Sequence, residues 1–132
     1  MSDSVHEYHQ VLLGYHWTGT GADSDVDMRY YFATPCKREM KATLVAMLAG
    51  SDSGTLAVKL QEGATTVDSD FADITGGGFT TLTDASDKAL ESIYFAISTG
   101  KKYIRSYHTV TGTVGNGGWT GACILNMLKT FA

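Results

Sequence analysis

The segment from Thr55 to Glu62 constrains the fold most, because apolar residues occupy every second position in it. Leu56, Val58 and Leu60 are the apolar residues, and polar residues such as Lys59 lie between them. Successive side chains of a β-strand point to opposite faces, so this alternation predicts a strand with one buried face. The glycines that flank the segment would end a helix too soon. The chain is therefore expected to contain an antiparallel sheet that packs one face on a core.

Other strands are predicted along the chain, separated by stretches rich in glycine and small polar residues. They cover residues 10–17, 26–33, 37–49, 71–74, 91–98, 102–111 and 119–128. With the first segment they make seven or eight strands, since the short 71–74 segment is the weakest of them. Short strands that alternate with glycine-rich turns are typical of a β-sandwich or a barrel.

Residues 37–49 are the ambiguous part of this reading, because several of their apolar residues also recur at helical spacing. The β-branched residues Thr43 and Val45 favour a strand. The sequence G-S-D-S-G at 50–54 then predicts a hairpin turn into the strand that starts at Thr55. The sequence G-N-G-G at 115–118 likewise predicts a turn between the last two strands.

The chain has 132 residues, which suits one domain with a core of its own. Residues 1–9 are polar and aperiodic, so they predict an N-terminal arm, and residues 10–132 form the predicted sandwich domain. The N-terminus has no basic and apolar leader, which predicts folding in a cytoplasm. In that reducing compartment, Cys36 and Cys123 are expected to be free thiols.

The charge and hydropathy patterns exclude two classes of partner. A formal net charge of −4 argues against nucleic acid, because binding to phosphates requires a basic face. No apolar run approaches the roughly 20 residues that span a bilayer, so no membrane partner is expected.

The last predicted strand, 119–128, is apolar on both faces. One face carries Trp119, Cys123, Leu125 and Met127, and the other carries Ala122, Ile124 and Leu128. A sandwich strand with one face in water would not have this composition. The second face is therefore expected to be covered, either by the arm or a helix of the same chain or by another subunit.

Three acidic residues alternate like the first ligands of a calcium loop, namely Asp23, Asp25 and Asp27. Such a loop also needs glycine at its sixth position and glutamate at its twelfth, which are Met28 and Thr34 here. The segment is therefore predicted to be a solvated acidic loop without a metal ion.

No other group of residues forms a recognisable catalytic, cofactor or metal site. The nearby histidines His6, His9 and His16 have no partners at ligand spacing. His108 is predicted to be a packed residue of a strand and not a general base. The sequence therefore predicts a protein that is not an enzyme, with no cofactor and no metal.

Large aromatic residues are the remaining signal, because they favour cores, protein interfaces and sugar-binding platforms. Most are expected in the core, and the others at a protein interface. The interface candidates are Tyr8, Tyr15, Trp17, Tyr107, Trp119 and Ile124.

Between Leu44 and Thr111 the sequence resembles the capsid decoration (cement) proteins of tailed bacteriophages. The resemblance is carried by G-S-D-S-G-T-L-A-V-K-L-Q-E-G, by F-A-D-I-T in the acidic loop and by G-K-K-Y-I-R before an alternating strand. These proteins are small, so the resemblance implies a single-domain, antiparallel β-sandwich with a jelly-roll-like fold. It provides no catalytic residues.

The resemblance implies a structural role on the exterior of a virion, after assembly in the host cytoplasm. The protein would stabilise an icosahedral capsid by bridging subunits of the major capsid protein. It would also associate with itself, and a homodimer is favoured over a homotrimer. The alternatives are a carbohydrate- or receptor-binding β-sandwich module, which would use exposed aromatics, and a component of the tail or of head completion.

Overall fold

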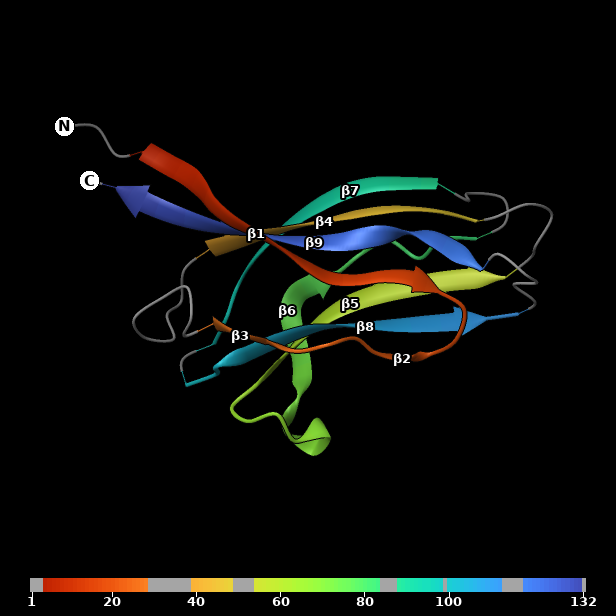
Figure 1. Cartoon of the computed structure of the whole chain (residues 1–132), viewed down its shortest axis with the longest axis horizontal. Helices are drawn as coiled ribbons and strands as arrows, with labels where there is room; N and C mark the ends of the chain where they lie inside the picture. The colour runs from red at the N-terminus through yellow and green to blue at the C-terminus, as the bar shows by residue number, and fades with distance from the viewer. Residues whose placement is uncertain are drawn as a thin grey trace.

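In a computed structural model the chain forms two antiparallel β-sheets that pack face to face (Figure 1). The structure describes residues 4–28, 39–48, 54–83, 88–98, 100–112 and 118–131. The predicted all-β, antiparallel sandwich is confirmed. The part of the chain described here contains no α-helix, only a short 3-10 turn at Asp68–Asp70 (η2).

The first layer is a four-stranded sheet with the order β1-β9-β4-β7. Its strands are Ser4–Trp17 (β1), Trp119–Phe131 (β9), Glu39–Leu48 (β4) and Lys88–Ala96 (β7). The second layer is a five-stranded sheet with the order β2-β8-β5-β6, and β3 also pairs with β8. Its strands are Gly21–Ala22 (β2), Val26–Asp27 (β3), Tyr103–Thr111 (β8), Thr55–Gly63 (β5) and Ala72–Gly78 (β6).

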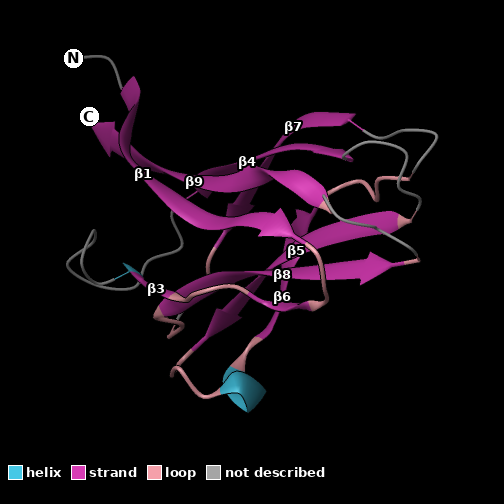
Figure 2. Ribbon diagram, turned by 45° about the vertical axis from the view of Figure 1, so that its right-hand side comes forward, coloured by secondary structure: helices cyan, strands magenta, loops and turns pink. Residues whose placement is uncertain are grey.

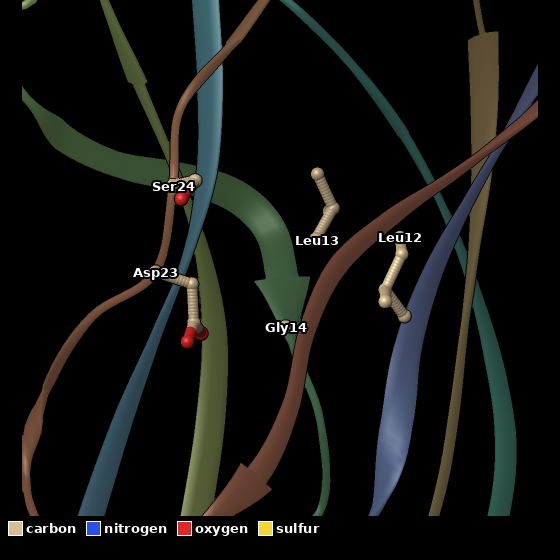
Figure 3. A pocket seen from close by; sticks show the side chains of 5 residues that line it. All are labelled: Leu12, Leu13, Gly14, Asp23 and Ser24. Atoms are coloured by element: carbon tan, nitrogen blue, oxygen red, sulfur yellow. The ribbon is translucent and has the colours of Figure 1, made fainter.

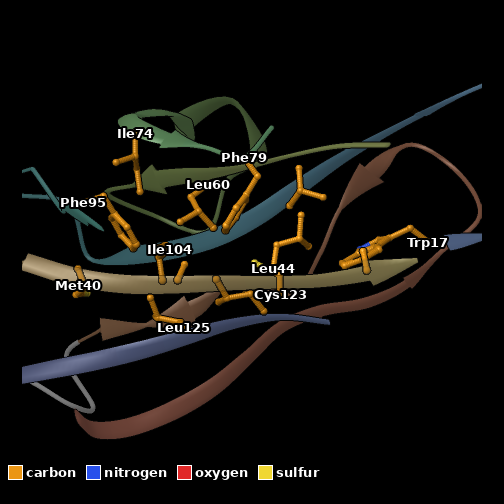
Figure 4. Close-up of a cluster of buried hydrophobic side chains, with 14 of the residues drawn as sticks. Trp17, Met40, Leu44, Leu60, Ile74, Phe79, Phe95, Ile104, Cys123 and Leu125 are labelled. Atoms are coloured by element: carbon orange, nitrogen blue, oxygen red, sulfur yellow. The ribbon is translucent and has the colours of Figure 1, made fainter. Parts of the chain in front are cut away.

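The core lies between the two sheets and consists of the inward-facing residues of each (Figure 4). Leu56, Val58 and Leu60 of β5 are buried, as their alternation predicts. From the opposite sheet, Leu44 of β4 and Leu125 of β9 are buried as well. Each large side chain removed from water in this way contributes about 1.5–3 kcal/mol.

Strand pairing corrects the predicted hairpin at 50–54. The segment after β4 leads into β5, but β4 pairs with β7 and β9 whereas β5 pairs with β6 and β8. The last two strands, β8 and β9, also belong to different sheets. Turn residues indicate that the chain reverses, but they do not determine which sheet the next strand joins. Residues 49–53 and 113–117, which include most of the two predicted turns, lie outside the described residues.

The first strand begins at Ser4 instead of Gln10, so most of the predicted N-terminal arm is part of β1. It pairs with β9 from Ser4 opposite Phe131 to Trp17 opposite Trp119. The backbone hydrogen bonds of this ladder do not depend on an apolar pattern, which is why polarity misled the prediction. The start of β1 and the end of β9 consequently lie beside one another (Figure 1).

The remaining predicted strands are present, most of them with shifted ends. Within the ambiguous segment 37–49, Glu39–Leu48 is a strand, β4, and not a helix. Of the strand predicted at 26–33, the structure describes Val26–Asp27 as β3, and residues 29–38 with Cys36 lie outside the described residues. No helix in the part of the chain that is described has the length and apolar composition to cross a membrane.

Gly121 of β9 provides a test of how closely β9 and β4 approach. A Cβ atom at this position would overlap the carbonyl oxygen of Val45 and would lie 2.6 Å from the Cα atom of Ala46. We therefore expect Gly121→Ala to lower the free energy of unfolding in urea by about 2–3 kcal/mol, as overpacking does. Gly19→Ala is the control, because a Cβ atom there meets nothing within 4 Å. Equal stability of the two variants would contradict this packing.

Candidate interaction surface and a buried carboxylate cluster

The outer face of the four-stranded sheet carries an apolar surface, which we call the apolar face. It comprises Leu12, Val45, Met47, Leu90, Tyr94 and Ile124. Strand register brings these residues together, because directly paired residues point to the same side of a sheet. Leu12 is paired with Ile124, and Val45 is paired with Leu90.

Three residues of the apolar face are largely exposed. Leu90 is 81% exposed, Tyr94 57% and Leu12 52%. Monomers rarely expose contiguous apolar patches larger than a few hundred Å², and such larger patches mark interaction sites. Single exposed leucines need no explanation, whereas these six apolar residues lie on four adjacent strands. The same register places Thr43, Ser92 and Lys41 among them, and Thr43 and Ser92 are hydrogen-bonded to each other.

No described segment of the chain covers this face. The β1 strand lies beside β9 in the same sheet, and η2 lies at the far edge of the other sheet (Figure 2). The sequence left two possible covers for the second face of β9, a segment of the same chain or another subunit. Within the described residues, the first of these is not found.

The outer face of the five-stranded sheet is polar, in contrast. Lys59 forms an ion pair with Asp73 at 3.0 Å, and Gln61 donates a hydrogen bond to the same carboxylate at 3.1 Å. The hydrogen bonds from Gln61 and from Lys59 lower the pKa of Asp73. Arg105 donates to Gln61 at 2.9 Å and binds Asp68 at 2.7 Å. These polar and charged side chains pair with one another on this face.

The structure separates the predicted interface residues. Trp17 and Trp119 are 1% and 0% exposed, so they belong to the core, and their prediction as interface residues is corrected. Large aromatic rings fill cores as readily as they form interfaces, so the residue type alone could not distinguish the two roles. Ile124 lies half-buried on the apolar face.

Of the other three candidates, the structure places only the side chain of Tyr107. Tyr107 is half-buried on the outer face of the five-stranded sheet, with the Lys59 ammonium 5.5 Å from its ring centre. The backbones of Tyr8 and Tyr15 belong to β1, and their side chains are outside what the structure describes.

A polar cluster around Asp23 is buried between β1 and β8. Ser106 donates to Asp23 Oδ2 at 2.5 Å, and Nδ1 of His108 lies 3.2 Å from the same oxygen. The backbone N–H of Asp23 also donates to the carbonyl of Ser106. Since the Asp23 and His108 side chains are only 15% and 12% exposed, the predicted solvated loop is wrong for Asp23. The prediction that His108 is a packed residue is confirmed, because its ring also lies against Trp17.

The cluster differs from a catalytic triad, although it contains serine, histidine and aspartate. In a triad the serine donates to the histidine, whereas here Ser106 and His108 both contact one carboxylate oxygen. Ser106 is also fully buried. Gly14 of β1 is required next to this carboxylate, because a Cβ atom there would overlap Asp23 and approach Ser106 to 2.9 Å. The cluster thus connects the two sheets at one edge of the sandwich.

A pocket of about 140 Å³ opens at this edge (Figure 3). It is lined by Leu12, Leu13, Gly14, Asp23 and Ser24. Asp23 lies between β2 and β3, and its carboxylate is next to Gly14 of β1. Among the described residues, no group of three potential ligands could hold a metal ion.

Sequence reasoning missed most residues of these two sites for identifiable reasons. The predicted strand began at Glu91, so Leu90 fell outside it. In β7, Leu90, Ser92 and Tyr94 lie on the same face. Asp23 resembled its exposed neighbour Asp25, and only the pairing of β2 with β8 places it against Ser106. A signal was present at Gly14, because a glycine inside an apolar strand indicates a close approach.

The Asp23 cluster predicts a position-specific loss of stability. Asp23→Ala removes the 2.5 Å hydrogen bond from Ser106 and the contact with His108 Nδ1, and leaves Ser106 with only its longer hydrogen bond to the Leu13 carbonyl. The unfolding free energy should therefore fall by about 1–3 kcal/mol. Asp25→Ala removes the same charge from an exposed position and should stay within about 0.5 kcal/mol of the parent protein. Urea denaturation measures both variants. A similar effect of the two substitutions would mean that only net charge matters.

The buried thiol of Cys123 predicts a pH-dependent stability. Burial, and secondly the charge of Asp23, raise the pKa of Cys123 to about 12. Between the unfolded pKa of about 8.5 and that value, the folded state holds a proton that the unfolded state has lost. The unfolding free energy should therefore fall as pH rises through this window, and the fall should be smaller in Cys123→Ala.

A thiol reagent provides a second measurement of the same property. At pH 8 Cys123 should react only after unfolding in urea, with peptide mapping to report it separately from Cys36. Rapid modification of Cys123 in the folded protein would contradict its burial.

Comparison with known proteins shows no relative, because no family model, no curated protein and no solved structure matches the chain. The functional conclusion therefore depends on the residues and geometry described above.

Proposed function

We propose that this protein is a structural component of a virion that decorates and stabilises an icosahedral phage capsid by bridging subunits of the major capsid protein. The observation that carries the proposal is the apolar face, because its exposed apolar side chains could pack on another subunit. The sequence resemblance to capsid decoration proteins supplies the class of assembly. The described sites offer no nucleophile next to a base, which supports a structural role over a catalytic one.

The order of the strands supports the jelly-roll part of the proposal. If β2 and β3 are counted as one interrupted strand, the sheets have the orders β1-β9-β4-β7 and β2/β3-β8-β5-β6. An eight-stranded sandwich of two such sheets is the plan of a jelly roll, which occurs in viral capsid proteins and in lectins. Fold alone does not decide between these functions.

The four-stranded sheet offers a face on which a second copy of the chain could pack. Four strands cover about 19 Å in width, and the nine residues of β7 extend about 30 Å. The resulting area of about 570 Å² is smaller than the roughly 800 Å² that each partner contributes to a standard interface. Two copies related by a two-fold axis would bury the same face of each sheet.

The sugar-binding alternative has less support from the described surface. Such a site needs two or three neighbouring aromatic rings that face the solvent. Tyr94 is the exposed aromatic residue of the apolar face, and Tyr107 lies on the opposite face under Lys59. These two rings cannot form one platform.

The proposed dimer can be tested with a charge on the apolar face. Leu90→Glu should make the protein a monomer at micromolar concentration, because burying an unpaired carboxylate opposes association. Leu90 is 81% exposed on an edge strand, so the substitution should leave folding intact. Thr75→Glu, at an exposed position of β6, is the matched control and should remain dimeric. Sedimentation velocity measures the state of each variant. A monomeric parent protein would overturn the proposed dimer.

The proposed location can be tested in a lysate of the source. The protein should sediment with large particles and remain with them after a salt wash. Protein that stays in the soluble fraction would contradict the virion assignment, and glycan binding would then be the next function to test.

A further inference from the structure

The pocket at the edge of the sandwich is lined by both apolar and polar residues. Leu12 and Leu13 supply apolar surface, whereas Asp23 and Ser24 supply a carboxylate and a hydroxyl. Leu12 also belongs to the apolar face, so the pocket lies at the rim of that face. A partner stacked on the apolar face would therefore leave the pocket at the border of the contact, open to a third protein.

The charge of Asp23 is only partly matched within the chain. Ser106 and His108 both contact its Oδ2 atom, and no contact to its Oδ1 atom is found among the described residues. No described lysine or arginine forms an ion pair with it. The backbone of Gly14 packs directly against the carboxylate and prevents it from moving toward β1.

We propose that this pocket receives a lysine or arginine side chain from the shell protein on which the dimer docks. The aliphatic part of such a side chain would pack on Leu12 and Leu13, and its charged end would bind Asp23 and Ser24. A charge-assisted hydrogen bond to a fixed, mostly buried carboxylate is stronger than one to a mobile surface carboxylate.

This inference rests on the proposed function and adds a mechanism for bridging. A dimer formed through the apolar face carries two copies of the pocket, one at each rim. Each pocket can bind a basic side chain from a different shell subunit, so one dimer connects two subunits. The binding of two linked sites is stronger than that of either site alone.

The pocket can be tested on the isolated protein with N-acetyl-arginine amide as the probe. In a two-dimensional amide NMR titration, the probe should shift the signals of Gly14, Asp23 and Ser24 and saturate in the millimolar range. N-acetyl-citrulline amide has the same shape without the charge and should cause no saturable shift. Asp23→Asn should weaken arginine binding about tenfold, because the charge is lost while hydrogen-bonding atoms remain.

Two further variants keep the test decisive. Asp25→Asn changes net charge by the same amount at an exposed site and should retain the affinity of the parent protein. Ser24→Lys places an ammonium group at the exposed wall of the pocket and should abolish binding even if Asp23→Asn fails to fold. Equal shifts with the citrulline probe, or equal weakening by the two asparagine variants, would overturn the proposal.

The outcome is independent of the test of the dimer. Loss of arginine binding in a protein that still dimerises would overturn the pocket alone. A monomeric protein that binds the arginine probe through Asp23 would overturn the dimer and leave the pocket in place.

Discussion

Hydrophobic packing between the two sheets determines the rest of the molecule. A β-strand divides its side chains between two faces, so a strand that is apolar throughout can bury only half of them in one core. In β9, Cys123 and Leu125 face inward and are fully buried, whereas Ala122 and Ile124 face outward. The apolar face is the direct consequence of this division.

The outer faces of the two sheets differ in composition. On the five-stranded sheet, Arg105, Gln61 and Asp73 form a connected row of hydrogen bonds and ion pairs. The four-stranded sheet has apolar residues at the corresponding positions, including Leu90 and Met47. One outer face therefore carries polar side chains that pair with one another, and the other carries exposed apolar side chains. The Asp23 cluster lies at the edge between the sheets, where it connects β1 to β8.

Much of the fold could be predicted because strand alternation is a local property. The burial of Leu56, Val58 and Leu60, and the strand at Glu39–Leu48, follow from residues that are neighbours in the sequence. The pairing of strands within a sheet is not local, which is why the hairpin predicted between β4 and β5 was wrong. The start of β1 at Ser4 was missed for the same reason, since its partner is the far end of the chain.

The site was predicted in part. The two apolar faces of β9 were visible in the sequence, but the other members of the apolar face come from β1, β4 and β7. Only the register places Val45 beside Leu90. Trp17 and Trp119 were predicted at an interface but are buried in the core. Their residue type could not decide this, because large aromatic side chains occur in both places.

The central claim is that the apolar face is a contact between subunits. Isotope-filtered NOE spectra of a mixture of labelled and unlabelled chains test it most directly, because they detect only contacts between two molecules. The account predicts intermolecular NOEs to the methyl groups of Leu90 and Met47. Intermolecular NOEs that arise only from the outer face of the five-stranded sheet, or none at all, would contradict it.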